Sequence, residues 1–195
     1  MKSRTIEMNA KQALARVAVA ALTMSAAGFA AWTEAEGDGP TKVRADGTVL
    51  HAPYIPTKGD VPTIGHGSTR YEDGTLVRMT DPAITSARAK ELARHLHSEE
   101  EARFIASLPG VAMHQEEFDL YLDFVGQYGI GNWRSSSMRR LLMTGQHRQA
   151  CQALLQWRRQ GGRDCSLPQN WGPQGCKGVW TRQQKRHADC MELQP

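Results

Sequence analysis

The chain has 195 residues, of which 40% are apolar and 23% are charged, and this is the composition of an ordinary soluble domain. At about 150 residues per domain, the length predicts one domain with some chain left over. These values exclude a disordered tail, a collagen-like fibre and a multi-span membrane protein. The net charge of +4 is spread unevenly: residues 1–33 carry +3, residues 34–133 carry −7 and residues 134–195 carry +8.

The first part of the chain has the pattern of an export signal. Basic residues between Lys2 and Arg16 precede an uncharged, alanine-rich run from Val17 to Thr33, as in signal sequences. Cleavage after Ala30 is one possible outcome. An uncleaved anchor is another, because the run is just long enough to cross a bilayer. The alternative is a buried first helix of a cytosolic domain, which the lack of a polar face disfavours.

Two kinds of local pattern follow the leader. Residues 37–79 are rich in Gly, Pro, Thr and Asp, and β-prone pieces at 48–50, 61–64 and 75–77 predict a small, irregular β lobe. From Asp81 onward, apolar stripes predict helices over 92–108, 118–128 and 150–155, and a short last helix from Trp180 to Cys190. The predicted fold class is α+β, with a small β-hairpin lobe and a larger helical lobe.

All four cysteines lie in the last 45 residues of the chain. No pair has the Cys-x-x-Cys spacing that structural zinc sites favour, so no metal site is predicted. Cys165 and Cys176 flank a loop rich in Pro and Gly, which favours a local disulfide between them. Cys151 and Cys190 would then pair and join two helices. Disulfides and an export leader both indicate a location outside the cytosol.

Three segments resemble the phage-type lysozymes of glycoside hydrolase family 24. The first is Glu36-Gly37 followed by residues 54–68, Tyr-Ile-Pro-Thr-Lys-Gly-Asp-Val-Pro-Thr-Ile-Gly-His-Gly-Ser. The second covers Gln115–Gly131, and the third runs from Ser137 through residues 150–154 to Trp157. The resemblance implies a lysozyme-like domain over residues 34–195 that uses no cofactor.

The resemblance also assigns a general acid. Cleavage of a glycosidic bond needs a carboxylic acid that is still protonated near neutral pH, whereas a free glutamic acid titrates near 4.3. A glutamate at a helix end that faces a cleft can be desolvated enough for this role. The family's Glu-Gly pair corresponds to Glu36 and Gly37, while Glu34 would point elsewhere on the same helix.

The residues that hold the attacking water correspond less well. Thr63 matches the family's threonine, but twenty-seven positions separate it from Glu36, which is more than the family has. An insertion at residues 38–48 is therefore expected. The family's intervening aspartate has no clear counterpart here. Either Asp60, in a longer hairpin, or Thr57, by hydrogen bonding alone, is the candidate that replaces it.

Two further residues are candidate substrate ligands. Gln127 matches a polar residue that lines the family's cleft, and His66 is either a cleft residue or an ordinary polar residue of the hairpin. The basic C-terminal part is expected to attract an anionic polymer, and the carboxylates of peptidoglycan stem peptides have that charge. Nucleic acid is not an expected partner, since the chain has an export leader and no recognisable reader motif.

The resulting hypothesis is an exported, monomeric endolysin that hydrolyses the β-1,4 bond between N-acetylmuramic acid and N-acetylglucosamine. The alternatives are a lytic transglycosylase acting on the same bond and a non-catalytic wall-binding protein. Relatives of this family carry signal-arrest-release segments. By analogy, residues 17–33 would first hold an inactive enzyme at the periplasmic face of the inner membrane, then leave the bilayer and complete the helix that ends at Glu36.

Overall fold

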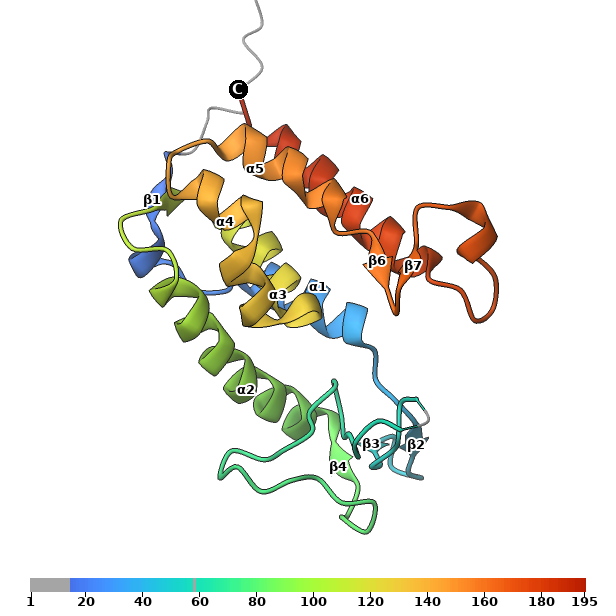
Figure 1. Ribbon diagram of the computed structural model, residues 1–195. Helices are drawn as coiled ribbons and strands as arrows, with labels where there is room; N and C mark the ends of the chain where they lie inside the picture. The colour runs from blue at the N-terminus through green and yellow to red at the C-terminus, as the bar shows by residue number, and fades with distance from the viewer. Residues whose placement is uncertain (1–14, 58) are drawn as a thin grey trace, which may run out of the picture.

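The computed structural model describes residues 15–57 and 59–195, so the basic residues that begin the leader (Lys2, Arg4 and Lys11) lie outside the described part. Figure 1 shows a helical lobe and a smaller β lobe connected by the long helix α2. This is the predicted α+β class. In chain order the elements are β1 (Val17–Ala18), η1 (Val19–Ala21), α1 (Ala26–Glu36), β2 (Thr41–Val43), β3 (Val49–His51), β4 (Ile84–Thr85), α2 (Ser86–Ala106), β5 (Ala112–Met113), α3 (Gln115–Ser135), α4 (Ser137–Leu142), α5 (His147–Ala153), η2 (Leu154–Gln156), β6 (Arg159–Gln160), β7 (Arg163–Asp164), η3 (Pro168–Asn170) and α6 (Lys177–Glu192).

The uncharged N-terminal run folds onto the helical lobe as three short elements. Strand β1 pairs with β5 in antiparallel register, and the Val19 amide donates a hydrogen bond to the Val111 carbonyl at 2.9 Å. Four apolar side chains of the run are buried in the main core: Val19, Leu22, Met24 and Phe29. In the part of the chain that is described, no helix has the length and apolar character needed to span a membrane.

Helix α1 has well-defined ends. The Ser25 hydroxyl caps its first turn by accepting from the Gly28 amide at 2.9 Å, and it donates to Asp119 of α3 at 2.5 Å. Gly28 lies so close to Asp119 that an added Cβ would stand 2.6 Å from its carboxyl carbon. At the other end, Gly37 has a φ of 75°, which other residues rarely adopt, and the helix therefore stops at Glu36.

The β lobe contains less regular sheet than the sequence predicts. Its sheet has the order β2-β3-β4, and residues 38–48, the expected insertion, supply β2 and the turn that follows it. The β-prone pieces at 61–64 and 75–77 form only isolated bridges, such as Tyr54 with Thr63. They are short and rich in turn residues, and a small core of Ile64, Val77 and Leu92 packs them against α2.

The helical lobe is built around Trp133, which is fully buried and contacts the rings of Phe104, Tyr121 and Phe124. The helix predicted over 118–128 extends through α3 to Ser135, with a break at Gly129, where φ is 82° and ψ is 153°. The last helix begins at Lys177, three residues before the predicted start. Both disulfides join the predicted pairs, Cys151 with Cys190 and Cys165 with Cys176.

Candidate active site

Glu36, the last residue of α1, lies where the two lobes approach each other. An added Cβ on Gly67 of the β lobe would stand 3.4 Å from the Glu36 Oε2 atom. On the helical side, Arg182 Nη1 of α6 lies 3.7 Å from Glu36 Oε1. The Glu36 side chain is 30% exposed, so it is half-buried but still reachable by a substrate.

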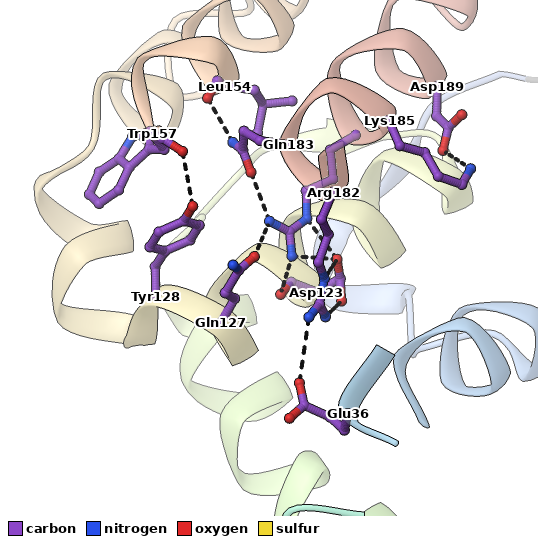
Figure 2. Close-up of polar contacts among 11 residues, drawn as sticks. Glu36, Asp123, Gln127, Tyr128, Leu154, Trp157, Arg182, Gln183, Lys185 and Asp189 are labelled. Carbon is purple, nitrogen blue, oxygen red and sulfur yellow. Dashed lines mark hydrogen bonds and ion pairs between the residues drawn. The ribbon is translucent and has the colours of Figure 1, made fainter. Parts of the chain in front are cut away.

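A polar network on α3 and α6 supports this carboxylate (Figure 2). Asp123 forms ion pairs with both Arg182 and Arg186, the latter at 2.6 Å. Arg186 is nearly fully buried and also donates to the Gln127 side-chain oxygen at 2.6 Å. Gln183 accepts from Arg186 at 2.8 Å and donates to the Leu154 carbonyl at 2.7 Å. Each buried charge of the network is therefore paired and hydrogen-bonded.

Burial raises the pKa of Glu36 above its ordinary value. The positive charge of Arg182 acts in the opposite direction, and the negative charge of Asp123 adds to the rise. The net effect is a higher pKa, because desolvation disfavours the charged form of a carboxyl group. A raised pKa moves the carboxyl group toward the protonated form that a general acid needs.

Thr63 is buried in the β lobe, and its hydroxyl donates to the Val61 carbonyl at 3.1 Å. Its backbone makes two hydrogen bonds with Tyr54, each of 2.8 Å. Burial raises the pKa of Tyr54, and the charge of Glu36 raises it further. Thr63 is thus hydrogen-bonded through its backbone to Tyr54, whose pKa is affected by the charge of Glu36.

Thr57 and Asp60 lie together in an exposed turn, where the Asp60 amide donates to the Thr57 carbonyl at 2.9 Å. Among the residues described, neither makes a hydrogen bond or ion pair with Glu36.

His66 is buried beside the chain that follows Glu36. Its Nδ1 atom lies 3.2 Å from the Gly37 carbonyl oxygen and 3.3 Å from Asp38 Oδ1. Both partners come directly after the candidate acid, so His66 holds the end of α1 in place.

The sequence pattern of the phage lysozyme family matches residues 43–169, well over half of the chain. The chain belongs to the phage lysozyme family. The match begins after Glu36 and therefore does not include it. Phage lysozymes are peptidoglycan-hydrolysing enzymes, and this endolysin-type lysozyme is one of them.

Solved structures of other phage lysozymes have the same fold. An endolysin of Escherichia coli O157:H7 phage FAHEc1 is 20% identical with a TM-score of 0.67, covering 88% of this chain and 95% of its own. A variant of P22 lysozyme is 22% identical with a TM-score of 0.66, covering 87% and 99%. The active form of the P1 phage endolysin Lyz is 16% identical with a TM-score of 0.62, covering 92% and 96%. No curated protein matches the chain in sequence.

Sequence reasoning about this lysozyme missed Asp123, Arg182 and Arg186. Arg182 and Arg186 are four residues apart, and this spacing places both on one face of α6. The spacing alone therefore indicates that the two side chains lie together. Charge runs of this kind are usually solvated, however, and the pattern does not reveal that a single aspartate from α3 pairs with both.

The lysozyme also has a basic hollow next to this network. It has a volume of about 630 Å³ and is lined by Tyr128 and Trp157, by Arg140 and Arg159, and by polar side chains between Asn132 and Gln156. Tyr128 follows Gln127 in α3 and donates to the Trp157 carbonyl at 2.9 Å. Aromatic, cationic and hydroxyl groups therefore lie together in this hollow.

One group of side chains in the described residues has metal-ligand geometry, formed by Glu117, Cys151 and Cys190. The two cysteines are joined in a disulfide, and a disulfide offers no thiolate to a metal. This group therefore does not fit a metal centre.

Proposed function

We propose that this lysozyme hydrolyses the β-1,4 bond between N-acetylmuramic acid and N-acetylglucosamine, with Glu36 as the general acid. The observation that carries the proposal is a half-buried carboxyl group, with a raised pKa, at the end of α1 and between the two lobes. In its protonated form Glu36 donates to the glycosidic oxygen as the bond from that oxygen to the sugar carbon breaks.

The remaining roles follow from the position of each residue. Arg182 pairs with the Glu36 side chain from the helical lobe, and Asp123 in turn pairs with Arg182. A water molecule then adds to the sugar carbon and passes its proton to the Asp60 carboxylate or, if Thr57 takes that position, to the surrounding solvent. We assign the positioning of that water to Thr63, together with Asp60 or Thr57 in the adjacent turn. Gln127 and His66 are the proposed substrate ligands, and Gln127 is the more accessible of the two.

The second candidate reaction is lytic transglycosylation. It is favoured by one observation: between Glu36 and Thr63 the family's aspartate has no clear counterpart. With a single acid, the 6-hydroxyl group of the muramic acid would attack and give a 1,6-anhydro product. Mass spectrometry of digested peptidoglycan separates the two reactions. Reducing muropeptides are the expected result, and anhydro muropeptides would refute hydrolysis.

The basic part of the lysozyme is the proposed contact for the stem peptides of peptidoglycan. Arg140 and Arg159 line the hollow beside Gln127, and stem peptides carry carboxylates. Attraction between exposed charges is screened over about 10 Å at 0.1 M salt. Binding of the lysozyme to purified walls should therefore weaken as the salt concentration rises.

We also propose that residues 17–33 remain in the mature enzyme. Cleavage after Ala30 would remove Val19, Leu22, Met24 and Phe29 from the core, together with the Ser25 cap of α1. Each buried apolar side chain stabilises the fold by roughly 1.5–3 kcal/mol. Their removal would therefore destabilise α1, the helix that positions Glu36.

Retention is compatible with a membrane-bound stage before the enzyme acts as a soluble monomer in the periplasm. The run from Val17 to Thr33 would leave the bilayer and fold as β1, η1 and α1. N-terminal sequencing of the periplasmic protein tests this proposal. A chain that keeps residues 17–33 supports release without cleavage, and a chain that begins near Ala31 overturns it.

A further inference from the structure

Two buried histidine rings of the β lobe contact the chain directly after Glu36. His51 is 1% exposed, and its Nδ1 atom lies 2.9 Å from the Asp38 carbonyl oxygen. His66 makes the same kind of contact with the Gly37 carbonyl oxygen, at 3.2 Å. Among the residues that the structure describes, no backbone amide donates to either carbonyl. At these two positions the chain is therefore hydrogen-bonded to the β lobe through histidine rings.

The second nitrogen of His51 reaches a third element of the fold. His51 ends β3, the central strand of the β-lobe sheet, and its Nε2 atom lies 2.9 Å from the hydroxyl oxygen of Ser86, the first residue of α2. A carbonyl oxygen can only accept a hydrogen bond, so Nδ1 carries the proton that faces Asp38. In the neutral ring Nε2 then accepts from the Ser86 hydroxyl. The ring thus links the chain that leaves α1 to the start of α2.

The turn that carries His66 also lies against the candidate acid. Gly67 has a φ of 82°, and an added Cβ on it would stand 3.4 Å from Glu36 Oε2. On the other side of the turn, an added Cβ on Gly65 would stand 2.8 Å from an alanine Cβ of α2. The rings of His51 and His66 pack together with centroids 5.6 Å apart. The turn is therefore packed between the acid and α2, and His51 lies against it.

We propose that His51 is a positioning residue for Glu36. By holding the Asp38 carbonyl, it keeps the end of α1 in the orientation in which the acid faces Gly67 and the substrate. The proposal rests on the role of Glu36 as general acid. His51 is buried and touches neither the substrate nor the reacting atoms. Without its hydrogen bond, residues 37 and 38 are free to turn, and a displacement of about 1 Å in an active site can lower the rate about a hundredfold.

His51→Leu and His51→Asn test the proposal as a matched pair. Leucine fills much of the volume of the ring but makes no hydrogen bond, whereas the amide N–H of asparagine can still donate to the Asp38 carbonyl. The rate of wall lysis, measured against wall concentration, gives kcat and KM. We expect His51→Leu to lower kcat about tenfold at an unchanged KM, and His51→Asn to keep most of the wild-type kcat. An unchanged kcat in His51→Leu, or an equal loss in both variants, overturns the proposal.

A control in the same lobe separates loss of position from loss of stability. Val77 is 3% exposed and belongs to the small β-lobe core, and its side chain makes no hydrogen bond. Val77→Ala should lower the midpoint of urea unfolding, as His51→Leu does, but should leave kcat unchanged. If Val77→Ala loses as much kcat as His51→Leu, stability alone sets the rate and the proposal is wrong.

Nitrogen NMR of the imidazole rings gives a readout that does not depend on activity. In the wild type, His51 should be the tautomer with its proton on Nδ1. Ser86→Ala should keep that tautomer, because the Asp38 carbonyl still requires a donor. A wild-type His51 with its proton on Nε2 alone cannot donate to Asp38, and this result would also overturn the proposal.

The two proposals can fail separately. If Glu36→Gln lyses walls normally, Glu36 is not the acid and the proposed function fails, whatever the NMR spectra show. If Glu36→Gln is inactive but His51→Leu keeps the wild-type kcat, only the role of His51 is refuted.

Discussion

Glu117 forms a buried anionic contact between the N-terminal segment and the C-terminal end of the chain. Its carboxylate is fully buried in the first turn of α3 and accepts from the His114 amide at 2.9 Å and from Gln194 at 2.8 Å. His147 Nδ1 and Arg16 Nε each lie 3.3 Å from it. Arg16 directly precedes β1, so this contact fixes the segment that leads into α1.

The stability that this contact provides follows from the pKa of Glu117. Burial by itself would raise the pKa, but hydrogen bonds from His147, His114 and Gln194 outweigh it and lower the value from 4.5 to about 2. This difference corresponds to about 3 kcal/mol of folding free energy. Because the folded-state pKa is depressed, the stabilisation is complete above pH 4.5 and is lost as the pH falls toward 2. About 2 kcal/mol of it should be gone by pH 3.

Glu117→Gln should therefore destabilise the enzyme by about 3 kcal/mol at pH 7, and the deficit should shrink to about 1 kcal/mol at pH 3. Urea unfolding at both pH values measures the deficit, with Glu116→Gln as control, because Glu116 is its exposed neighbour and should show no pH-dependent difference. A deficit that stays constant between pH 7 and pH 3 would refute the ionised contact.

Three further outcomes follow from the same structure. Arg182→Gln removes a positive charge that lowers the pKa of Glu36, so the alkaline limb of wall lysis should move to higher pH; a shift to lower pH would contradict the pairing. Cys190→Ser opens the bridge to Cys151, which spans 39 positions, and should cost roughly 3–4 kcal/mol in urea unfolding; reduction of the wild type, which also opens Cys165–Cys176, should cost at least as much, and a smaller loss would contradict the role of this bridge. A chain that starts at Ala31 should lose about 6 kcal/mol or more of the stabilisation that apolar burial provides. Its circular dichroism should therefore show no cooperative melting, and a native-like melt would argue against retention of the N-terminal run.

Features that depend on local sequence were predictable. The helices followed from their apolar stripes, and the disulfide pairs followed from the Pro- and Gly-rich loop between Cys165 and Cys176. Glu36 was assigned through the resemblance to the family's Glu-Gly pair, and the end of its helix has a local cause: Gly37 adopts a positive φ that few other residues tolerate.

Features that depend on contacts between distant elements were not predictable. Nothing local shows that Arg182 lies beside Glu36, 146 positions earlier, or that Asp123 pairs with two arginines. The uncharged run is compatible with a bilayer and with a protein core, because both are apolar, and the sequence cannot choose between them. The β-prone pieces at 61–64 and 75–77 form isolated bridges rather than strands. Turns lie so close to both ends of each piece that a longer run of paired residues cannot form.

Glu36→Gln, assayed on purified cell walls, decides whether Glu36 is the general acid of this lysozyme. The substitution keeps the shape of the side chain and removes its titratable proton. The variant should still sediment with the walls, since the basic hollow is intact, but should no longer lower their turbidity. A variant that clears walls as fast as the wild type would contradict the assignment.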